Sequence, residues 1–395
     1  MMPTFNETAL HLAAIRALEA ADLAAAHAPS VPTDGPCTLD EITSQWLSDT
    51  LGAGVPGARL EAVRVADEHA GMTDRRKLYL QWNAKGEAAG LPTSVFIKAT
   101  PDGPYLRETL ALLHMAENEV NFYNQVQPEL AEFTPRAYYA RSYAGGRFLI
   151  VMEDLEARDL HPYWLADYCS IDHAKAVVRT QARQHALFWE SPRFASDLCW
   201  LRPRTRRFGL NWHWASFETA RSRFRETDIG SILPPYIDKL LQRWSEVYAQ
   251  VYAYWDSKPM TLLHGDAHLG NTFAFPDGRA GYFDWQVAFR GYGLRDLAYF
   301  MISALTNEDR QAHERDIFDV YLQTLAEHGV ILEPVEAWRD YCLLVLDRFD
   351  ASMKTYTHGG YGHAREATQR QLHAAMGSLQ DNDVATLLER ALGSS

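Results

Sequence analysis

Three polar side chains that could bind a metal ion and accept a proton lie close together in the sequence. Asp266 follows the apolar segment Thr261–Leu263, and Asn271 comes five residues after it. Pro276–Arg279 contains Asp-Gly, a strong two-residue hairpin signal. Counting outward from that loop puts Asn271 opposite Asp284, with Cβ atoms about 5 Å apart. An amide oxygen and a carboxylate at this separation suit a hard cation, while Asp266 lies beside them as a proton acceptor.

This set of groups meets the needs of phosphoryl transfer from a magnesium nucleotide, in which one carboxylate deprotonates the acceptor hydroxyl while an Asn and a second carboxylate hold the metal. The segments His264–Asn271 (HGDAHLGN) and Asp284–Gln286 (DWQ) resemble the motifs of the aminoglycoside phosphotransferase and choline kinase superfamily. The resemblance is strongest to its ecdysteroid-kinase-like branch of small-molecule kinases. It implies ATP and Mg²⁺ as cofactors, with Asp266 as base and Asn271 and Asp284 as metal ligands.

The same resemblance gives supporting roles to three further residues. His264 positions the backbone of the loop, and His268 is a second support or a substrate contact. The segment Gly291–Ala298 (GYGLRDLA) resembles the family's helix start, in which Asp296 supports the catalytic loop by capping or hydrogen bonding.

Two other functions fit some of these residues. His264, Asp266 and His268 form an HxDxH pattern that is also found in metal-dependent hydrolases, although such a site needs further ligands from other loops. A kinase-like protein that binds a nucleotide without transferring phosphate is the second alternative. It is disfavoured because the residues expected for transfer are all present.

A lysine and a glutamate are predicted to form the ion pair that positions the nucleotide phosphates. The apolar strand Thr93–Lys98 ends in Lys98, like the kinase strand whose lysine contacts the phosphates. Leu106–Gln125 has the apolar spacing of one helix. On it Glu119 begins EVNFY, which resembles the family's ExxFY motif, and the resemblance implies that Glu119 holds Lys98. Glu117 is the alternative, and the two glutamates point to different sides of the helix.

A loop between two predicted strands is a weaker candidate for phosphate binding. The strands are Leu60–Ala66 and Arg76–Trp82, and the loop between them has a single glycine. Gly71, Met72 and Thr73 are candidates only because of their position, and an ordinary hairpin loop explains them equally well.

A predicted buried strand, Arg147–Met152, is followed by Glu153, Asp154 and Leu155. The resemblance implies that this segment joins two lobes and that backbone groups of Glu153 and Leu155 contact adenine. The end of an ordinary strand explains the same residues.

The fold implied is α+β and protein-kinase-like, with an N-terminal antiparallel sheet plus a helix and a larger, mainly helical C-terminal lobe. We expect a helical N-terminal extension over 1–37, a nucleotide-binding lobe over 38–152 and a catalytic lobe over 153–395. The extension is predicted from an Ala- and Leu-rich helical stretch at 5–27.

Composition narrows the possible partners. A net charge of −13 argues against nucleic-acid binding. The four cysteines are scattered without a CxxC pair, as in a reduced cytoplasmic protein. No apolar run reaches membrane-spanning length.

DWQ stands in place of DFG, and no activation segment of the protein-kinase type follows it. We therefore expect a cytoplasmic enzyme that acts on a small-molecule hydroxyl, without a protein substrate or a membrane contact.

The acceptor itself is left open among three classes. Aromatic richness favours a sterol-like molecule, acidity favours an amino alcohol or aminoglycoside, and an arginine cluster favours a hydroxyacid or its thioester. The candidate walls are the Arg- and Trp-rich segment 195–225 and the Gly-His-Tyr loop 355–363. A solvated basic face and a surface turn are their simpler explanations. The arginines of the cluster are Arg202, Arg204, Arg206 and Arg207.

Overall fold

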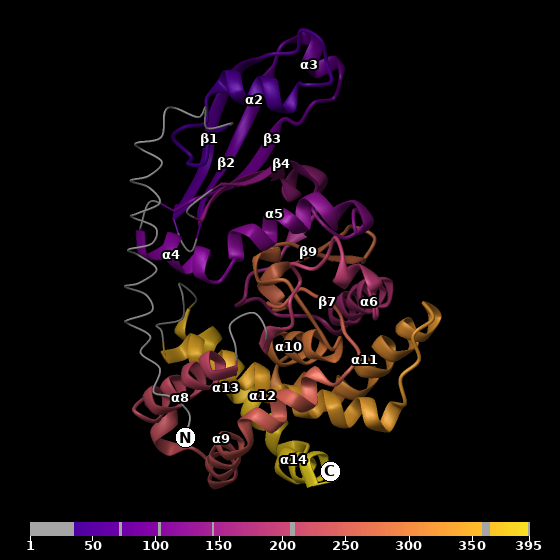
Figure 1. Cartoon of the computed structure of the whole chain (residues 1–395). Coiled ribbons are helices and arrows are strands. Elements are labelled where there is room, and N and C mark those ends of the chain that lie inside the picture. The colour runs from indigo at the N-terminus through magenta and orange to yellow at the C-terminus, as the bar shows by residue number, and fades with distance from the viewer. Residues whose placement is uncertain are drawn as a thin grey trace. The chain divides into compact units, whose positions relative to one another are not determined.

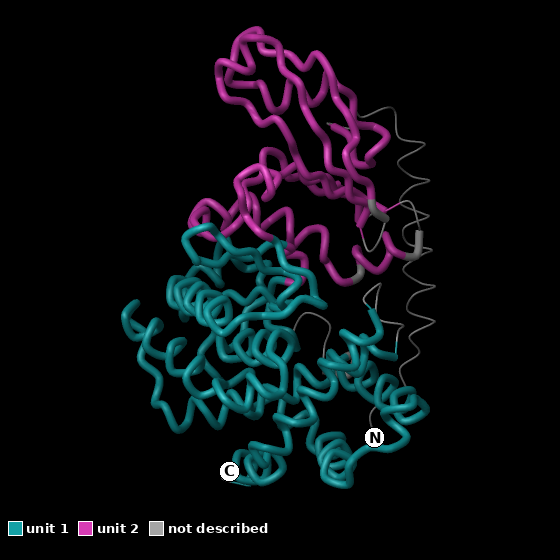
Figure 2. The backbone as a smooth tube through the Cα atoms, turned by 180° about the vertical axis from the view of Figure 1, so that it is seen from behind, with its two compact units in different colours: residues 1–5, 162–283, 288–395 teal, residues 6–161, 284–287 magenta. Residues whose placement is uncertain are grey.

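The computed structural model describes residues 35–70, 73–101, 104–143, 146–205, 210–357 and 364–393. These residues form two compact units (Figure 2). The N-terminal unit contains 35–161 together with 284–287, and the C-terminal unit contains 162–283 and 288–393. The short stretch 284–287 therefore belongs to the N-terminal unit although its neighbours in the chain belong to the other. The predicted helix at 5–27 lies outside the described residues.

The N-terminal unit is built on a five-stranded antiparallel sheet with the order β1-β2-β3-β5-β4 (Figure 1). Helices α4 and α5 lie between β3 and β4 in the chain. An antiparallel N-terminal sheet is what the sequence predicts. The elements are α2 Ser44–Leu51, β1 Leu60–Ala70, β2 Asp74–Trp82, α3 Ala84–Ala88, β3 Ser94–Ala99, α4 Pro104–Leu112, α5 Met115–Gln125, β4 Ala137–Tyr143 and β5 Arg147–Glu153.

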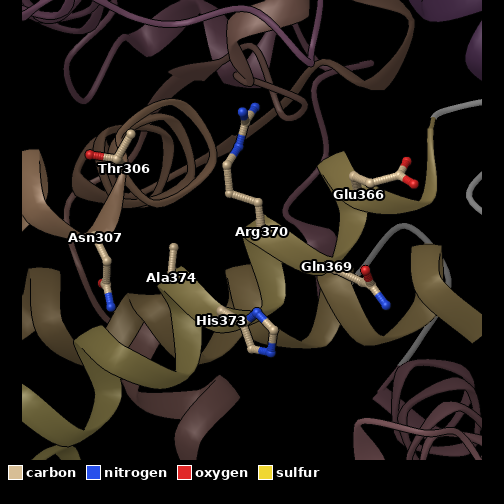
Figure 3. A pocket seen from close by; sticks show the side chains of 7 residues that line it. All are labelled: Thr306, Asn307, Glu366, Gln369, Arg370, His373 and Ala374. Carbon is tan, nitrogen blue, oxygen red and sulfur yellow. The ribbon is translucent and has the colours of Figure 1, made fainter.

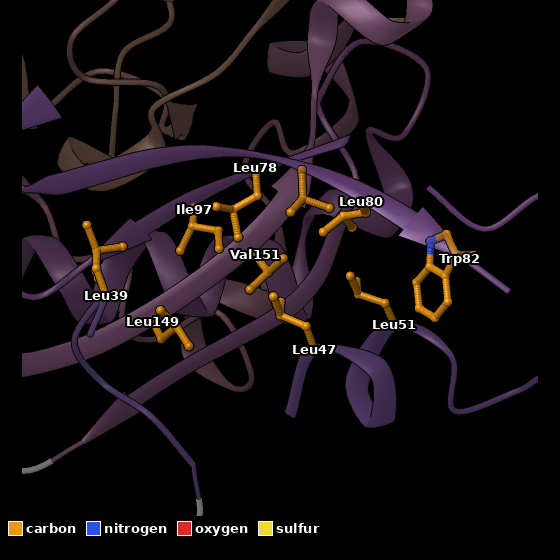
Figure 4. Packing of buried hydrophobic residues seen from close by; sticks show 11 residues of the cluster. Leu39, Leu47, Leu51, Leu78, Leu80, Trp82, Ile97, Leu149 and Val151 are labelled. Atoms are coloured by element: carbon orange, nitrogen blue, oxygen red, sulfur yellow. The ribbon is translucent and has the colours of Figure 1, made fainter. Parts of the chain in front are cut away.

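Apolar side chains that alternate with exposed residues along the strands form the core on one face of this sheet. On β2, Leu78, Leu80 and Trp82 are buried, and the residues between them are exposed, as expected for a strand with one covered face. The buried residues pack with Leu47 and Leu51 of α2 (Figure 4). Each buried side chain of this size contributes roughly 1.5–3 kcal/mol. This core fixes the strands from which the site residues project.

The helix predicted at Leu106–Gln125 is in fact two helices. It is interrupted at His114, whose φ is 51°. A non-glycine residue in the left-handed region ends a right-handed helix, so α4 stops at Leu112 and α5 begins at Met115. Apolar spacing carries no signal for such a break. The position of Glu119 therefore depends on α5 alone.

The C-terminal unit is mainly helical, as predicted, and its short strands lie next to the loops that carry the site residues. Among the described residues, no helix is both long and apolar enough to cross a membrane. The elements are β6 His161–Pro162 at the junction of the units, α6 Ile171–Leu187, α8 Leu210–Arg225, α9 Pro235–Asp256, β7 Thr261–Leu263, β8 Thr272–Ala274, β9 Ala280–Tyr282, β10 Phe289–Gly291, α10 Leu294–Ala304, α11 Asn307–Glu327, α12 Pro334–Thr357, α13 Arg365–Asp381 and α14 Val384–Gly393.

Candidate active site

A buried lysine lies between two carboxylates in the N-terminal unit. The Lys98 ammonium donates to both Glu119 oxygens, at 2.8 and 2.7 Å, and to Oδ1 of Asp284 at 3.0 Å. The side chains of Lys98 and Glu119 are 4% and 1% exposed. Burial raises the pKa of Glu119, against the attraction of the Lys98 ammonium. The structure thus brings together three residues that are far apart in the sequence.

The alternative partner, Glu117, lies elsewhere. Its carboxylate is 60% exposed and is 3.0 Å from Nδ1 of His114, one turn back on the helix. Because Glu117 and Glu119 are two residues apart, they lie on different faces of α5, and the structure places only Glu119 against Lys98.

Arg75 is a second cation at this site, and it was not predicted from the sequence. It lies directly opposite Lys98 in the β2–β3 register, and its guanidinium is 3.7 Å from Oδ2 of Asp284. Directly opposed residues share a face of the sheet. Two adjacent arginines, Arg75 and Arg76, follow the predicted loop and were the available signal in the sequence. The register of β2 with β3 places Arg75 opposite Lys98 and Arg76 opposite Ile97.

Asp284 is held in a strained conformation. Its φ is 67°, a region that costs a non-glycine residue about 1–3 kcal/mol. The next residue anchors it: Trp285 is fully buried and stacks on Phe122 of α5, with ring centroids 3.9 Å apart. Asn118, also on α5, donates to the carbonyl of Gln286 at 3.3 Å. The tryptophan of the DWQ motif therefore fixes the segment that carries Asp284.

The catalytic-loop candidate of the C-terminal unit follows β7. Oδ1 of Asp266 accepts the hydroxyl of Tyr299 at 2.8 Å, and its Oδ2 lies 3.5 Å from Nε2 of His268. Burial raises the pKa of Asp266, but the charge and hydrogen bond of His268 and the hydroxyl of Tyr299 outweigh it, so the pKa lies well below its ordinary value. The side chain is 28% exposed. Asp266 is therefore an accessible carboxylate that stays ionised.

The side-chain amide of Asn271 is held by the loop that carries Asp266. Its Nδ2 donates to the backbone carbonyl of Asp266 at 2.9 Å and lies 3.5 Å from Oδ2 of the same residue. Because the nitrogen is used in this way, Oδ1 is the side-chain atom that remains to face a ligand. Oxygen is the atom that Mg²⁺ requires, so Asn271 fits the metal role predicted for it.

The predicted register of the hairpin was wrong by one residue. Thr272 pairs with Tyr282, and the amide of Phe283 donates to the carbonyl of Asn271. Asn271 is thus opposite Phe283, the residue before Asp284. The loop holds three residues and not two, because Gly278, with a φ of 84°, donates to Phe275. A type I turn followed by a left-handed glycine is the usual three-residue hairpin.

Asp296 supports the loop through backbone hydrogen bonds. Its carboxylate accepts the amide of His264 at 2.6 Å and that of Gly265 at 3.3 Å. Burial raises the pKa of Asp296, but the hydrogen bond of His185 and the charge of Arg295 lower it below its ordinary value. Gly265 has a φ of 86°, which favours glycine at the turn before Asp266.

The geometry of His264 opposes the hydrolase alternative. Its Nε2 is 2.9 Å from the carbonyl of Phe283, and its Nδ1 accepts the amide of Asp266 at 3.3 Å. Both ring nitrogens therefore face the protein backbone. Within the described part of the chain, no group of three or more His, Cys, Asp or Glu side chains is arranged to hold a metal ion. The HxDxH pattern is explained by loop support.

The predicted nucleotide contacts are described only in part. Gly71 and Met72 lie outside the described residues. Thr73 is buried and accepts Nε of Arg75 at 3.2 Å. The predicted loop is shorter than expected, since β1 runs to Ala70 and β2 begins at Asp74. Thr73 is thus tied to the second cation of the site.

Glu153 and Leu155 lie at the end of β5 and at the start of a 3-10 turn, Leu155–Arg158. The amide of Glu153 donates to Arg136, and the carbonyl of Leu155 accepts the amide of Leu160. These two backbone groups are already used, and a contact of either residue with adenine stays a prediction.

One arginine of the predicted basic cluster has a structural partner. Arg204 forms an ion pair with Asp347 of α12, whose other oxygen accepts Nε of Arg295 at 2.8 Å. Arg295 in turn donates to the carbonyl of Gly265. Burial raises the pKa of Asp347, but Arg204 and Arg295 lower it to about 2. Arg204 is therefore linked to the loop that carries Asp266 and is not part of a solvated face; Arg206 and Arg207 lie outside the described residues.

A pocket of about 350 Å³ opens on the C-terminal unit, over α11 and α13 (Figure 3). Its arginine is satisfied by the fold, since Arg370 donates to the carbonyls of Leu165 and Ala166. None of the predicted site residues lines this pocket. Its lining residues are Thr306, Asn307, Glu366, Gln369, Arg370, His373 and Ala374.

Comparison with known proteins identifies relatives of this chain. A sequence profile of the ecdysteroid kinase-like family matches residues 75–333. No curated protein matches the sequence. Solved structures similar to this one include choline kinase from Cryptosporidium parvum, with 10% identity over 86% of this chain and 95% of that chain and a TM-score of 0.49. Plasmodium vivax ethanolamine kinase has 12% identity over 94% and 96% of the two chains and a TM-score of 0.49. Macrolide 2'-phosphotransferase from Brachybacterium faecium has 16% identity over 83% and 97% and a TM-score of 0.46.

Proposed function

Because the chain belongs to the ecdysteroid kinase-like family, we propose that it is a kinase that transfers the γ-phosphoryl group of ATP to a hydroxyl of a small molecule. The observation that carries the proposal is the Lys98 ammonium, buried between Glu119 and Asp284. A buried ion pair of this kind is what positions nucleotide phosphates in kinases. A cytoplasmic location and the absence of a protein substrate belong to the same proposal.

The nucleotide end of the reaction uses the cations of the N-terminal unit. Lys98 binds phosphate oxygens while Glu119 fixes its position, and Arg75 supplies a second positive charge beside it. Asn271, through Oδ1, and Asp284 are the proposed ligands for Mg²⁺. The bound metal supplies charge neutralisation on the phosphates. Asp284 already faces two cations, so its carboxylate lies where positive charge is favoured and could also hold a metal ion.

The acceptor end uses Asp266. Its low pKa keeps it ionised at neutral pH, so it orients the acceptor hydroxyl and takes its proton as the phosphoryl group moves in line. Tyr299 fixes one carboxylate oxygen by its 2.8 Å hydrogen bond. His264 and Asp296 hold the backbone of the loop.

Thermal unfolding with ATP, Mg²⁺ and EDTA tests the nucleotide site first. A ligand that binds only the folded state raises the midpoint. We expect a rise that requires both ATP and Mg²⁺, followed by acceptor-dependent release of ADP. Stabilisation by Zn²⁺ alone, with no response to ATP, would contradict the proposal. Binding of MgATP without transfer to any hydroxyl acceptor would instead indicate a silent nucleotide-binding protein.

A further inference from the structure

A buried arginine near Asp266 has no acidic partner. Arg348, on α12, is 3% exposed, and its Nε has no hydrogen-bond partner. Within the described residues, no carboxylate lies within ion-pair distance of it. The guanidinium instead contacts an aromatic ring, that of Tyr299, whose centroid is 4.3 Å from Cζ of Arg348. The guanidinium is thus a buried positive charge that no acidic side chain of the described residues neutralises.

Two other buried arginines of the C-terminal unit are neutralised. Nε of Arg295 is 2.8 Å from Asp347, and Nη1 of Arg310 is 3.0 Å from Glu314. Burying a charge is costly unless it is paired. A contact with an aromatic ring offsets only part of that cost. Arg348 therefore differs from these two arginines, because no carboxylate in the described part of the chain pairs with it.

The position of Arg348 relates it to the proposed base. Tyr299 is contacted by Arg348 at its ring and donates its hydroxyl to Asp266 at 2.8 Å. A single side chain thus separates the unpaired guanidinium from the carboxylate that would receive the acceptor's hydroxyl. All three residues belong to the C-terminal unit.

We propose that Arg348 binds an anionic group of the acceptor, a carboxylate or a phosphate, while the acceptor hydroxyl lies at Asp266. This inference rests on the proposed kinase function and names its substrate class. A planar guanidinium binds such anions through two parallel hydrogen bonds. An amino alcohol or an aminoglycoside would bring a second positive charge to Arg348, and a neutral sterol would leave the buried charge unpaired. The acceptor is an acidic hydroxyl compound.

Pairs of acceptors that differ only in charge test the proposal. Suitable pairs are 4-hydroxybutyrate with 1,4-butanediol, and glycerol 3-phosphate with glycerol, measured by ADP release. We expect the wild type to prefer the anionic member of at least one pair. In Arg348→Gln, kcat/KM for that member falls about 100-fold or more, while KM for ATP is unchanged. Equal use of both members by the wild type, or an equal preference in the variant, would overturn the inference.

A binding measurement keeps the inference separate from the kinase proposal. With ATP present, inorganic phosphate should raise the unfolding midpoint of the wild type more than NaCl of equal ionic strength, and Arg348→Gln should lose this response. Arg193→Gln, which alters a surface arginine paired with Asp197, is the matched control. Failure of MgATP to bind would contradict the kinase proposal alone, whereas an equal phosphate response in wild type and Arg348→Gln would contradict the anion site alone.

Folding of the variants separates a binding role from a structural one. Since an unpaired buried charge destabilises a protein, Arg348→Gln should unfold at the same temperature as the wild type or higher. Arg348→Lys should keep the charge but lose the paired hydrogen bonds, with intermediate use of the anionic acceptor. Arg348 would be a structural residue, and the proposal would be wrong, if Arg348→Gln unfolded at a much lower temperature than the wild type while Arg348→Lys kept the wild-type unfolding temperature.

Discussion

The two carboxylates proposed for the reaction are held by opposite means. Asp284, in the N-terminal unit, faces the cations Lys98 and Arg75 and is 12% exposed. Asp266, in the C-terminal unit, is held by a tyrosine hydroxyl and a histidine and is 28% exposed. A carboxylate that already lies beside positively charged side chains is suited to bind a metal ion. A more open carboxylate that a hydroxyl and a histidine keep ionised is available to orient an acceptor hydroxyl and take its proton during the transfer. Environment thus separates their roles.

Loss of the Asp266 charge should have the largest effect on activity. Asp266→Asn removes the proton acceptor but keeps the shape of the side chain, so kcat should fall by about 10²–10⁴ while the ATP-dependent rise in the unfolding midpoint remains. Steady-state kinetics and thermal unfolding measure both. Asp277→Asn, in the exposed hairpin loop, is the control and should keep its turnover. Wild-type turnover in Asp266→Asn would remove Asp266 from the mechanism.

Breaking the cation cluster should act on stability as well as on nucleotide binding. Lys98→Met leaves Glu119 buried without its counter-ion, which costs about 3–5 kcal/mol. Urea unfolding should show this loss in the N-terminal unit, and Lys98→Met with Glu119→Leu should recover much of it. Glu117→Gln, at an exposed position of the same helix, should change stability by less than about 0.5 kcal/mol. A Lys98→Met protein as stable as the wild type would contradict the ion-pair argument.

Two buried groups, His213 in the C-terminal unit and Glu119 in the N-terminal unit, should respond to acid in opposite directions. Burial first, and then the charge of Arg204, lowers the pKa of His213 to about 3. A group with a lowered folded pKa stabilises the protein above its unfolded pKa, about 6.5 for histidine. That stability is lost as the pH falls, by up to about 1.4 kcal/mol per pH unit. The pKa of Glu119 is raised in the folded protein. The stability that this group contributes therefore changes in the opposite direction and is lost as the pH rises.

Hydrogen exchange at pH 7 and pH 5, corrected for intrinsic rates, can separate these effects. Peptides of α8, which carries His213, should lose more protection at pH 5 than peptides of β3. His213→Gln should reduce the loss in α8. Equal losses in both units, or an unchanged loss in the variant, would show that His213 is not the source of the acid sensitivity.

A smaller effect is expected at Arg75. Its side chain is 33% exposed and 3.7 Å from Asp284, so solvent screens its charge. Arg75→Gln should raise KM for ATP about 10-fold with little change in kcat. Arg76→Gln alters the adjacent residue, which pairs with Glu68 and Asp40, and should leave KM for ATP unchanged. Equal effects of the two substitutions would indicate a general loss of positive charge.

Local patterns were enough to predict the main elements. Apolar alternation and helical spacing predicted individual strands and helices, including the strand that ends in Lys98, while the resemblance to a kinase family implied their arrangement into an antiparallel sheet and a helical C-terminal unit. The break at His114 was missed because its neighbours keep helical spacing. The hairpin register was missed because Asp277-Gly278 is compatible with a loop of two or three residues, and one residue decides which side chain faces Asn271.

The missed site residues depend on tertiary contacts. Arg75 is selected by strand register, and Tyr299 reaches Asp266 only once α10 lies beside the loop. Arg348 carries no signal in the sequence, because an arginine on a long helix is usually exposed. Its significance lies in its burial without an acidic partner among the described residues, which only the packed structure reveals.

The link from Arg204 through Asp347 and Arg295 to the carbonyl of Gly265 has a consequence for protein engineering. Arg204 lies in a segment that would be an obvious choice for exchange between family members in order to alter substrate preference. An exchanged segment without an arginine at this position would leave Asp347 with one cation fewer and would loosen the turn before Asp266. A chimera that changes this segment therefore also has to carry a compatible α12. Otherwise a fall in turnover would be mistaken for a change in specificity.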